Sequence, residues 1–155
     1  MDQSGIYQAL ERSEFFRGLQ KSDIEKIAGL CHVKTYEPGQ YVFQQGEEGE
    51  NILVIAEGKV ALERTVELGS RKGTVLIGIL GKGRVFGCWS TLIGEPHDLL
   101  SSASCQLPTK VLVLKGADLR SVMLHNTALG FRVLERLCFV LRDRIQAAYG
   151  AMEKI

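Results

Sequence analysis

Long apolar segments are missing from this sequence. No stretch of the 155 residues approaches the roughly 20 consecutive apolar residues that a membrane-spanning helix needs. The N-terminal residues Met1-Asp2-Gln3 also lack the basic start and the apolar core of a secretory signal peptide. We therefore expect a cytoplasmic protein with no membrane partner.

The sequence also has little net charge and no closely spaced cysteine pairs. The formal net charge is +1, which gives no large field to attract nucleic acids or lipid surfaces. The cysteines form no CxxC or CxxH pair and are scattered at Cys31, Cys88, Cys105 and Cys138. The histidines have no ligand-like spacing with one another or with the cysteines, and stand at His32, His97 and His125. The sequence thus argues against a disulfide scaffold, and we predict no metal site and no resident cofactor.

Catalytic motifs are absent as well. The chain contains no GxSxG nucleophile elbow, no P-loop and no HExxH helix. Glu47, Glu48 and Glu50 are close in sequence, but they fall on a turn between short strands and are typical of a solvated acidic loop. We therefore expect no enzyme activity and name no catalytic residue.

Short strands separated by glycines fill the middle of the chain. Apolar segments alternate with Gly39, Gly46, Gly49 and Gly58, where glycine permits sharp turns. The unbroken apolar run 52–55 predicts a strand buried on both faces. Strands this short and this regularly punctuated favour a small antiparallel barrel or a jelly roll, and the periodicity alone does not choose between the two.

Helices are predicted on both sides of the strands. Ser22 and Glu25 have the spacing of a capping box, which predicts a helix start before Ile24. A short helix is expected over 118–125 and a long, proline-free helix over 127–152. With 45% hydrophobic residues, the sequence is interpreted as one domain over 1–155, with N-terminal helices in 1–31, strands in 32–115 and C-terminal helices in 116–155.

The long C-terminal helix carries two apolar stripes. One has the alternating 3 and 4 spacing of a helix-pairing seam and consists of Phe131, Leu134, Cys138, Leu141, Ile145, Ala148 and Met152. The other lies beside it and consists of Val133, Leu137 and Val140. One stripe can pack on the barrel and leave the other for a homodimer partner; the alternative is a single wide surface that faces the core. The charged residues that mostly flank the stripes are interpreted as a solvated face: Arg132, Glu135, Arg136, Arg142, Asp143 and Arg144.

These features together resemble the cyclic nucleotide-binding domain superfamily, which includes the sensor domain of catabolite activator protein and the regulatory subunits of protein kinase A. The resemblance rests on the Pro38-Gly39 turn, the segment 42–49, the strand and turn 52–58, Phe86-Gly87 and the long terminal helix. It implies an eight-stranded antiparallel jelly roll with short N-terminal helices and a long C-terminal helix.

The resemblance also implies a phosphate-binding cassette, which begins at Phe86-Gly87. In nucleotide binders, a glutamate follows to bind the ribose and an arginine about nine residues later binds the phosphate. Here Cys88 replaces the glutamate, and His97 falls on the arginine position, or Asp98 if the register slips by one. The pocket residues implied by this cassette are Phe86, Gly87, Cys88, Trp89, Ser90, His97 and Asp98.

Such a cassette predicts weak or absent binding of cyclic AMP and cyclic GMP. Losing one partner of a buried charge pair typically costs about 2 to 5 kcal/mol, which is roughly one to four decades of affinity. Nearby basic residues could instead reach an anion, although they are more typical of exposed hairpins: Arg64, Arg71, Lys72 and Arg84. Cys88 is either a reactive thiol at a helix start or a small residue that fills the core, and Trp89 either fills the ligand cavity or covers the barrel core.

Two functions therefore remain open at this level. The first is a regulatory sensor whose pocket takes a small-molecule effector and signals through the terminal helix to a downstream protein. The second is a module without a ligand that only dimerises or docks. Family members that bind DNA carry a helix-turn-helix after the long helix, and this sequence stops at Ile155, so we expect no direct DNA binding. A chain cut from a transcription regulator ahead of its DNA-binding domain would look the same.

Overall fold

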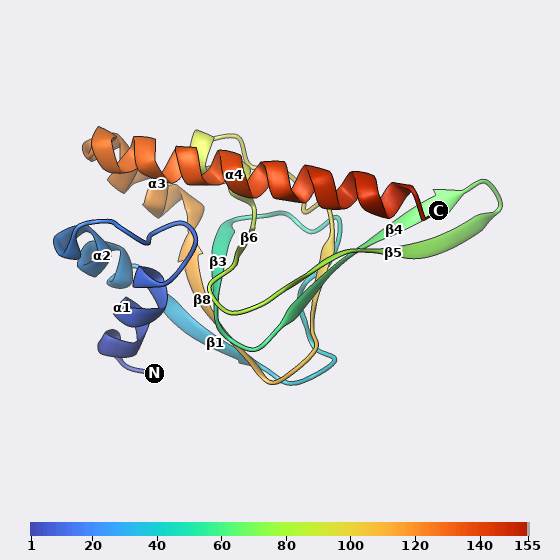
Figure 1. Cartoon of the computed structure of the whole chain (residues 1–155), viewed down its shortest axis with the longest axis horizontal. Coiled ribbons are helices and arrows are strands. Elements are labelled where there is room, and N and C mark those ends of the chain that lie inside the picture. Colours follow the sequence, from blue (N-terminus) through green and yellow to red (C-terminus); the bar gives the residue numbers. More distant parts are fainter. Residues whose placement is uncertain (155) are drawn as a thin grey trace.

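The computed structural model describes residues 1–154, and strands form the middle of the chain (Figure 1). Within these residues the strands are β1 (His32–Tyr36), β2 (Tyr41–Phe43), β3 (Asn51–Glu57), β4 (Val60–Leu68), β5 (Arg71–Leu80), β6 (Val85–Gly87), β7 (Ser102–Cys105) and β8 (Thr109–Lys115). The helices are α1 (Gln3–Glu11), α2 (Lys21–Ala28), the 3-10 helix η1 (Trp89–Ile93), α3 (Gly116–His125) and α4 (Thr127–Met152).

The strands of residues 1–154 pair into two four-stranded sheets. One has the order β1-β8-β3-β6 and the other the order β2-β7-β4-β5. Every pair of neighbouring strands in both sheets is antiparallel. The two sheets face each other as a jelly roll with helices at both ends, which confirms the predicted fold class.

Strand β3 is buried on both faces, as its unbroken apolar run predicted. Because successive side chains of a strand point to opposite sides, Leu53 and Ile55 enter the core between the sheets. Ile52 and Val54 point the other way and pack in a second core, beneath the helices. This second core joins α1, α2, α3 and α4 to one sheet, so the helices are part of the folded unit.

The N-terminal helices begin differently from the prediction. Helix α2 starts at Lys21, its N-cap Gln20 makes no side-chain hydrogen bond, and the capping box at Ser22 and Glu25 is therefore wrong. Glu25 instead lies within the helix, 3.9 Å from the Lys21 Nζ. A side chain placed after the first turn cannot reach the free amides at the helix start, so the spacing alone was misleading.

The C-terminal helices follow the prediction closely. Helix α4 runs from Thr127 to Met152 as expected, and the Asn126 side chain accepts a hydrogen bond from the Leu129 amide at 3.2 Å. Helix α3 begins at Gly116, ahead of the predicted start. Helix α4 then runs along the barrel and ends beside the β4–β5 hairpin, whose tip extends beyond it (Figure 1).

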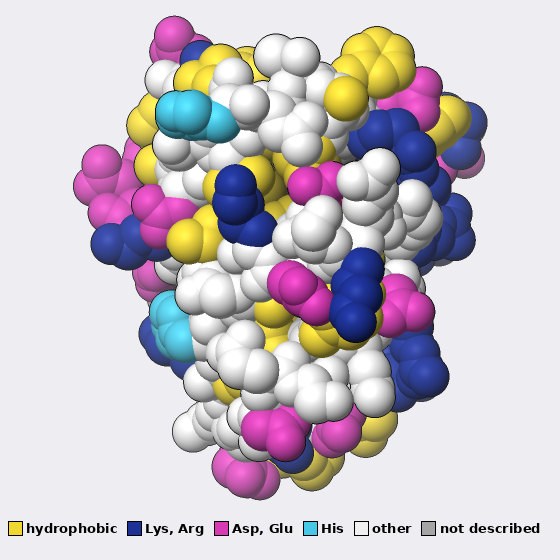
Figure 2. Space-filling view, turned by 90° about the vertical axis from the view of Figure 1, so that its left-hand side faces the viewer, with side chains coloured by type: hydrophobic (Ala, Val, Ile, Leu, Met, Phe, Trp, Pro, Cys, Tyr) yellow, Lys and Arg dark blue, Asp and Glu magenta, His cyan; other side chains and the backbone are white. Residues whose placement is uncertain are grey.

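The surface shows no dominant charge. In Figure 2, which views the side that carries the N-terminal helices, basic and acidic side chains are interspersed. This distribution agrees with the net charge of +1. None of the helices in residues 1–154 is both long and apolar enough to cross a bilayer.

Candidate functional site

A large cavity separates α4 from the barrel. Its volume is about 580 Å³, and it is bounded by the β4–β5 hairpin, by the segment 85–101 and by the second half of α4. Four of the predicted cassette residues line it: Phe86, Gly87, Trp89 and His97. The site that the sequence predicted therefore faces a space that α4 closes on the opposite side.

Phe86 and Gly87 anchor the start of the cassette in β6. Phe86 pairs with Leu53 in β3, and its ring lies 5.7 Å from that of Phe43, so it belongs to the barrel core. Gly87 has a φ of 115°, and a Cβ there would overlap the Asn51 carbonyl. Only glycine accommodates that close approach, so this Phe-Gly pair is explained by the fold, whatever ligand is bound.

Cys88 is completely buried. Its Sγ donates toward the His97 carbonyl at 3.4 Å and lies 3.9 Å from the Ser90 hydroxyl. A Cβ at Gly49 would lie 2.5 Å from the Cys88 Cβ, so the backbone at Gly49 packs directly against the Cys88 side chain. Of the two interpretations of Cys88, this burial favours a small residue that fills the core.

The cassette helix η1 is held by side chains from its own turn and from α3. Ser90 is buried, and the Thr91 hydroxyl donates to the Cys88 carbonyl at 2.7 Å. Arg120 in α3 donates to the Leu92 carbonyl at 2.9 Å. A Cβ at Gly116 would overlap the Thr91 side chain, so α3 begins directly against η1. The cassette is thus mechanically linked to the C-terminal helices.

His97 and Asp98, the two candidates for the arginine position, lie in different environments. The His97 ring lines the cavity, and its centroid is 5.0 Å from that of Trp89. Asp98 is exposed and does not line the cavity; its backbone forms an isolated bridge with Glu48. The structure therefore brings Trp89 and His97 together and leaves Asp98 outside.

The histidine ring has one unused polar atom. His97 Nδ1 lies 2.7 Å from the Asp98 carbonyl, and a carbonyl only accepts, so Nδ1 carries the proton. His97 Nε2 is buried and has no partner among the described residues. Buried polar atoms are normally paired, so a group that enters the cavity would find a partner here.

The basic residues near the pocket have distinct roles. Arg84 forms an ion pair with Glu14, at 2.9 Å between Nε and Oε2, and Lys72 lies 3.8 Å from Glu67. Arg64 is exposed at the rim of the cavity, where it donates to the Leu100 carbonyl. Of the four hairpin candidates, Arg64 alone is among the lining residues.

The sequence analysis missed Arg144. It was interpreted as part of a solvated face, but it is half-buried, lines the cavity and donates to the Val85 carbonyl at 2.6 Å. Burial lowers its pKa, a change that Glu14 opposes. Its spacing was the available signal, because Arg144 follows the buried Leu137 and Val140 by seven and four residues and so shares their helix face.

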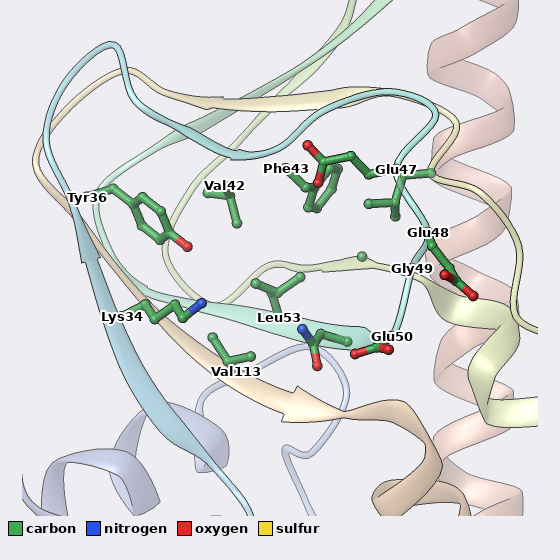
Figure 3. A pocket seen from close by; sticks show the side chains of 13 residues that line it. Lys34, Tyr36, Val42, Phe43, Glu47, Glu48, Gly49, Glu50, Leu53 and Val113 are labelled. Atoms are coloured by element: carbon green, nitrogen blue, oxygen red, sulfur yellow. The ribbon is translucent and has the colours of Figure 1, made fainter.

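A second, smaller pocket opens beside the first (Figure 3). Its volume is about 140 Å³, and Lys34 and Tyr36 from β1 face it from one side. Glu47, Glu48 and Glu50 line it from the acidic loop. Three carboxylates against one lysine make this pocket unfavourable for an anion.

The two stripes of α4 are buried to different degrees. Val133, Leu137 and Val140 are buried against the helix-side core. The other stripe is exposed at every second member, with exposed fractions of 66% at Phe131, 52% at Ile145 and 63% at Met152. Cys138 is also exposed, whereas Leu134, Leu141 and Ala148 are half-buried. The helix therefore packs through one stripe and presents alternate members of the other to solvent.

Residues 1–154 contain no cluster of potential metal ligands. Within residues 1–154, no group of three or more histidine, cysteine, aspartate or glutamate side chains is placed to hold a metal ion. The site is instead an apolar cavity with a few polar groups, an arrangement that suits a small organic ligand.

Comparison with known proteins identifies the family. The family profile described as "Cyclic nucleotide-binding domain" matches residues 33–126. The "Cyclic AMP receptor protein" of Thermus thermophilus is 32% identical over 109 residues, which cover 70% of this chain and 48% of the receptor. The cGMP-dependent protein kinase 2 of Homo sapiens is 31% identical over 78 residues, covering 50% of this chain and 10% of the kinase.

The same fold is seen in solved structures. A cyclic nucleotide-binding domain from Methylobacillus flagellatus superposes with a TM-score of 0.78 at 20% identity, covering 99% of this chain and 84% of that one. The chain spans about half the length of the Thermus receptor and a smaller share of the kinase. The chain thus belongs to the cyclic nucleotide-binding domain family.

Proposed function

We propose that this domain senses a small-molecule effector in the cavity between the barrel and α4, and that it does not bind cyclic AMP or cyclic GMP in the usual way. The observation that carries the proposal is the position of the cavity. Cassette residues such as Trp89 and His97 form one wall, and Leu141 and Ile145 of α4 form another. A molecule that enters would therefore contact the cassette and the long helix at the same time.

The degenerate cassette argues against the usual ligand. A buried thiol at Cys88 is covered by Gly49 and offers no carboxylate to a ribose hydroxyl. At the arginine position, the group that faces the cavity is the His97 ring, which lacks the paired donors of a guanidinium. We therefore infer that a cyclic nucleotide would lose two of the contacts on which the family's binding mode depends.

Signal transfer would run from the cassette to the terminal helix. Arg120 ties α3 to η1, and Gly130 in α4 lies close to Met123 of α3. A shift of η1 on ligand binding would therefore displace α3, and α3 would displace α4. A two-state switch of this kind needs a ligand that contacts one arrangement better than the other.

A thermal-shift titration tests the ligand claim. With 1 mM cyclic AMP, cyclic GMP or a cyclic dinucleotide and a dissociation constant above 1 mM, stabilisation stays below about 0.4 kcal/mol, or roughly 1–2 °C. The Thermus cyclic AMP receptor protein serves as the positive control. A rise of several degrees with any of these nucleotides would contradict the proposal.

We further propose that the exposed stripe of α4 pairs with a second copy of this chain. Phe131, Cys138, Ile145 and Met152 recur every seven residues, the period of a two-helix seam. An exposed apolar stripe of this length on a charged surface is typical of an interaction site. It also supports the second candidate function, a dimerisation or docking module that needs no ligand.

Light scattering and crosslinking test the dimer. We expect about twice the chain mass of 17.1 kDa at 50 µM, and a Cys138–Cys138 disulfide after mild copper-phenanthroline oxidation. Phe131→Glu should yield a folded monomer, whereas Leu124→Glu, at a residue that is 63% exposed at the end of α3, should leave the dimer intact. A wild-type monomer at this concentration would refute the pairing and leave the effector claim standing.

A further inference from the structure

The charges around the cavity are of one sign. Among its lining residues are two arginines, Arg64 and Arg144, and one histidine, His97, but no aspartate or glutamate. The remaining lining is almost entirely apolar. Taking the cavity as the effector site proposed above, we propose that its ligand is an apolar carboxylic acid, with an acyl or aromatic body and a single negative charge.

Arg144 provides the principal positive charge. Glu14 and Asp143 are the carboxylates that act on it, but Glu14 already pairs with Arg84 at 2.9 Å and accepts from the Val85 amide at 2.8 Å, and Asp143 pairs with Arg142 at 3.3 Å. Two carboxylates therefore serve three guanidinium groups, those of Arg84, Arg142 and Arg144, and one positive charge is left over. A half-buried charge without full compensation still carries a desolvation cost, and a ligand carboxylate in the cavity would offset it.

The geometry of Arg144 leaves donors for such a carboxylate. A guanidinium carries five N–H groups, and the structure gives Arg144 one hydrogen bond, from Nη2 to the Val85 carbonyl at 2.6 Å. Arginine binds carboxylates through two parallel hydrogen bonds, which adds both strength and orientation. Burial lowers the pKa of Arg144, which reflects the partial removal of this guanidinium from water.

His97 and Trp89 offer a second polar contact and an aromatic wall. The unpartnered His97 Nε2 can accept from a protonated group, or donate to a carboxylate when the ring is charged. The Trp89 ring, 5.0 Å from the His97 ring, gives a flat apolar surface beside it. Polar groups are otherwise limited to Arg64 at the rim and Ser101.

The rest of the cavity selects for an apolar body. Leu137, Val140, Leu141, Ile145 and Ala148 of α4 form one wall. A volume of about 580 Å³ lies within the range of roughly 300–1,000 Å³ that is usual for small-ligand sites. The hydroxyl groups of a sugar would be buried here without hydrogen-bond partners, which is unfavourable. An acyl chain has no such groups and could be buried without this cost. The acidic pocket beside it, lined by three glutamates, would repel the same anion.

Calorimetric titration with octanoate and octan-1-ol at pH 7.5 tests the proposal. The two probes share their chain and differ in charge, so octanoate should bind at least about tenfold more tightly, the effect of one charge-assisted contact. Arg144→Gln should remove that preference and leave octan-1-ol unchanged, and Arg144→Lys should keep part of it. The matched control is Arg142→Gln, at an exposed arginine of the same helix that does not line the cavity.

A variant that fills the cavity keeps the test independent of Arg144. Ala148→Phe should abolish binding of both probes while circular dichroism shows a folded chain. If octan-1-ol binds as tightly as octanoate, or if Arg144→Gln has no effect, the anionic ligand class is wrong and the cavity remains the effector site. The third outcome is that neither probe binds and that the fluorescent apolar anion 8-anilinonaphthalene-1-sulfonate does not bind either. In that case both the anionic ligand class and the proposed effector site are wrong.

Discussion

The contact between Gly49 and Cys88 yields a quantitative prediction for Gly49→Ala. An added Cβ would lie 2.5 Å from the Cys88 Cβ, 2.7 Å from its Sγ and 3.1 Å from the His97 carbonyl. Real Cβ atoms do not approach this closely, and Cys88 is fully buried and cannot turn away. Overpacking of this kind typically costs about 1–3 kcal/mol, which lowers the melting temperature of a domain of this size by about 2–12 °C.

The same contact predicts that two substitutions will be coupled. Cys88→Gly removes both atoms that the new methyl group would strike. The double variant Gly49→Ala/Cys88→Gly should therefore be more stable than the sum of the single effects implies, by about 1–3 kcal/mol. Unfolding in urea, followed by circular dichroism, measures all four proteins.

A matched alanine substitution separates this effect from the general one of replacing glycine. Gly78 in β5 has no atom within 4 Å of its added Cβ, so Gly78→Ala should change stability by less than about 0.5 kcal/mol. The reasoning is refuted if Gly49→Ala unfolds at the wild-type urea concentration. It is also refuted if the two cassette substitutions are additive within about 0.5 kcal/mol.

Three further predictions concern the turn after β3 and the cysteines. Gly58 has a φ of 100°, and its added Cβ would lie 2.7 Å from the Pro108 carbonyl, so Gly58→Ala should cost about 2–5 kcal/mol in urea unfolding; a loss below about 1 kcal/mol would contradict this. Ellman's reagent at pH 8 should modify one thiol of the native chain rapidly, that of exposed Cys138, and a second fast thiol would count against the structure. Burial raises the pKa of Cys31 from 9.0 to about 12, so its contribution to stability is fully present below pH 9 and is lost as the pH rises toward 12. The decline in melting temperature above pH 9 should be shallower in Cys31→Ala, and equal slopes would disprove the assignment.

Local sequence patterns predicted the strands and helices, and the family resemblance then selected the jelly roll over a barrel. The glycine spacing of 39–58 and the apolar run 52–55 mark turns and a strand buried on both faces, and both are local properties of the backbone and side chains. The long helix over 127–152 was equally readable, because its apolar period is continuous and lacks proline. The start of α2 could not be predicted from the sequence, because the capping pattern at Ser22 also fits the interior of a helix.

The cassette was only partly readable from the sequence. Sequence counting placed either His97 or Asp98 at the arginine position, and the order of residues could not decide between them. Only the folded chain shows the His97 ring in the cavity and Asp98 at the surface. These positions depend on the path of the segment 94–98 relative to Gly49, which is distant in sequence and whose amide donates to the His97 carbonyl at 3.3 Å.

The sequence by itself thus predicted the short strands, their turns and the bracketing helices, and the family resemblance predicted the jelly roll and a cassette without the usual glutamate and arginine. The tertiary structure decided where the remaining chemistry lies. It buried the thiol of Cys88, left His97 Nε2 without a partner and placed Arg144 on the cavity wall. The physical reason is that strand and helix patterns reflect near neighbours in the chain. The surroundings of a charge depend on which distant segments pack around it, here α4 docked against β6.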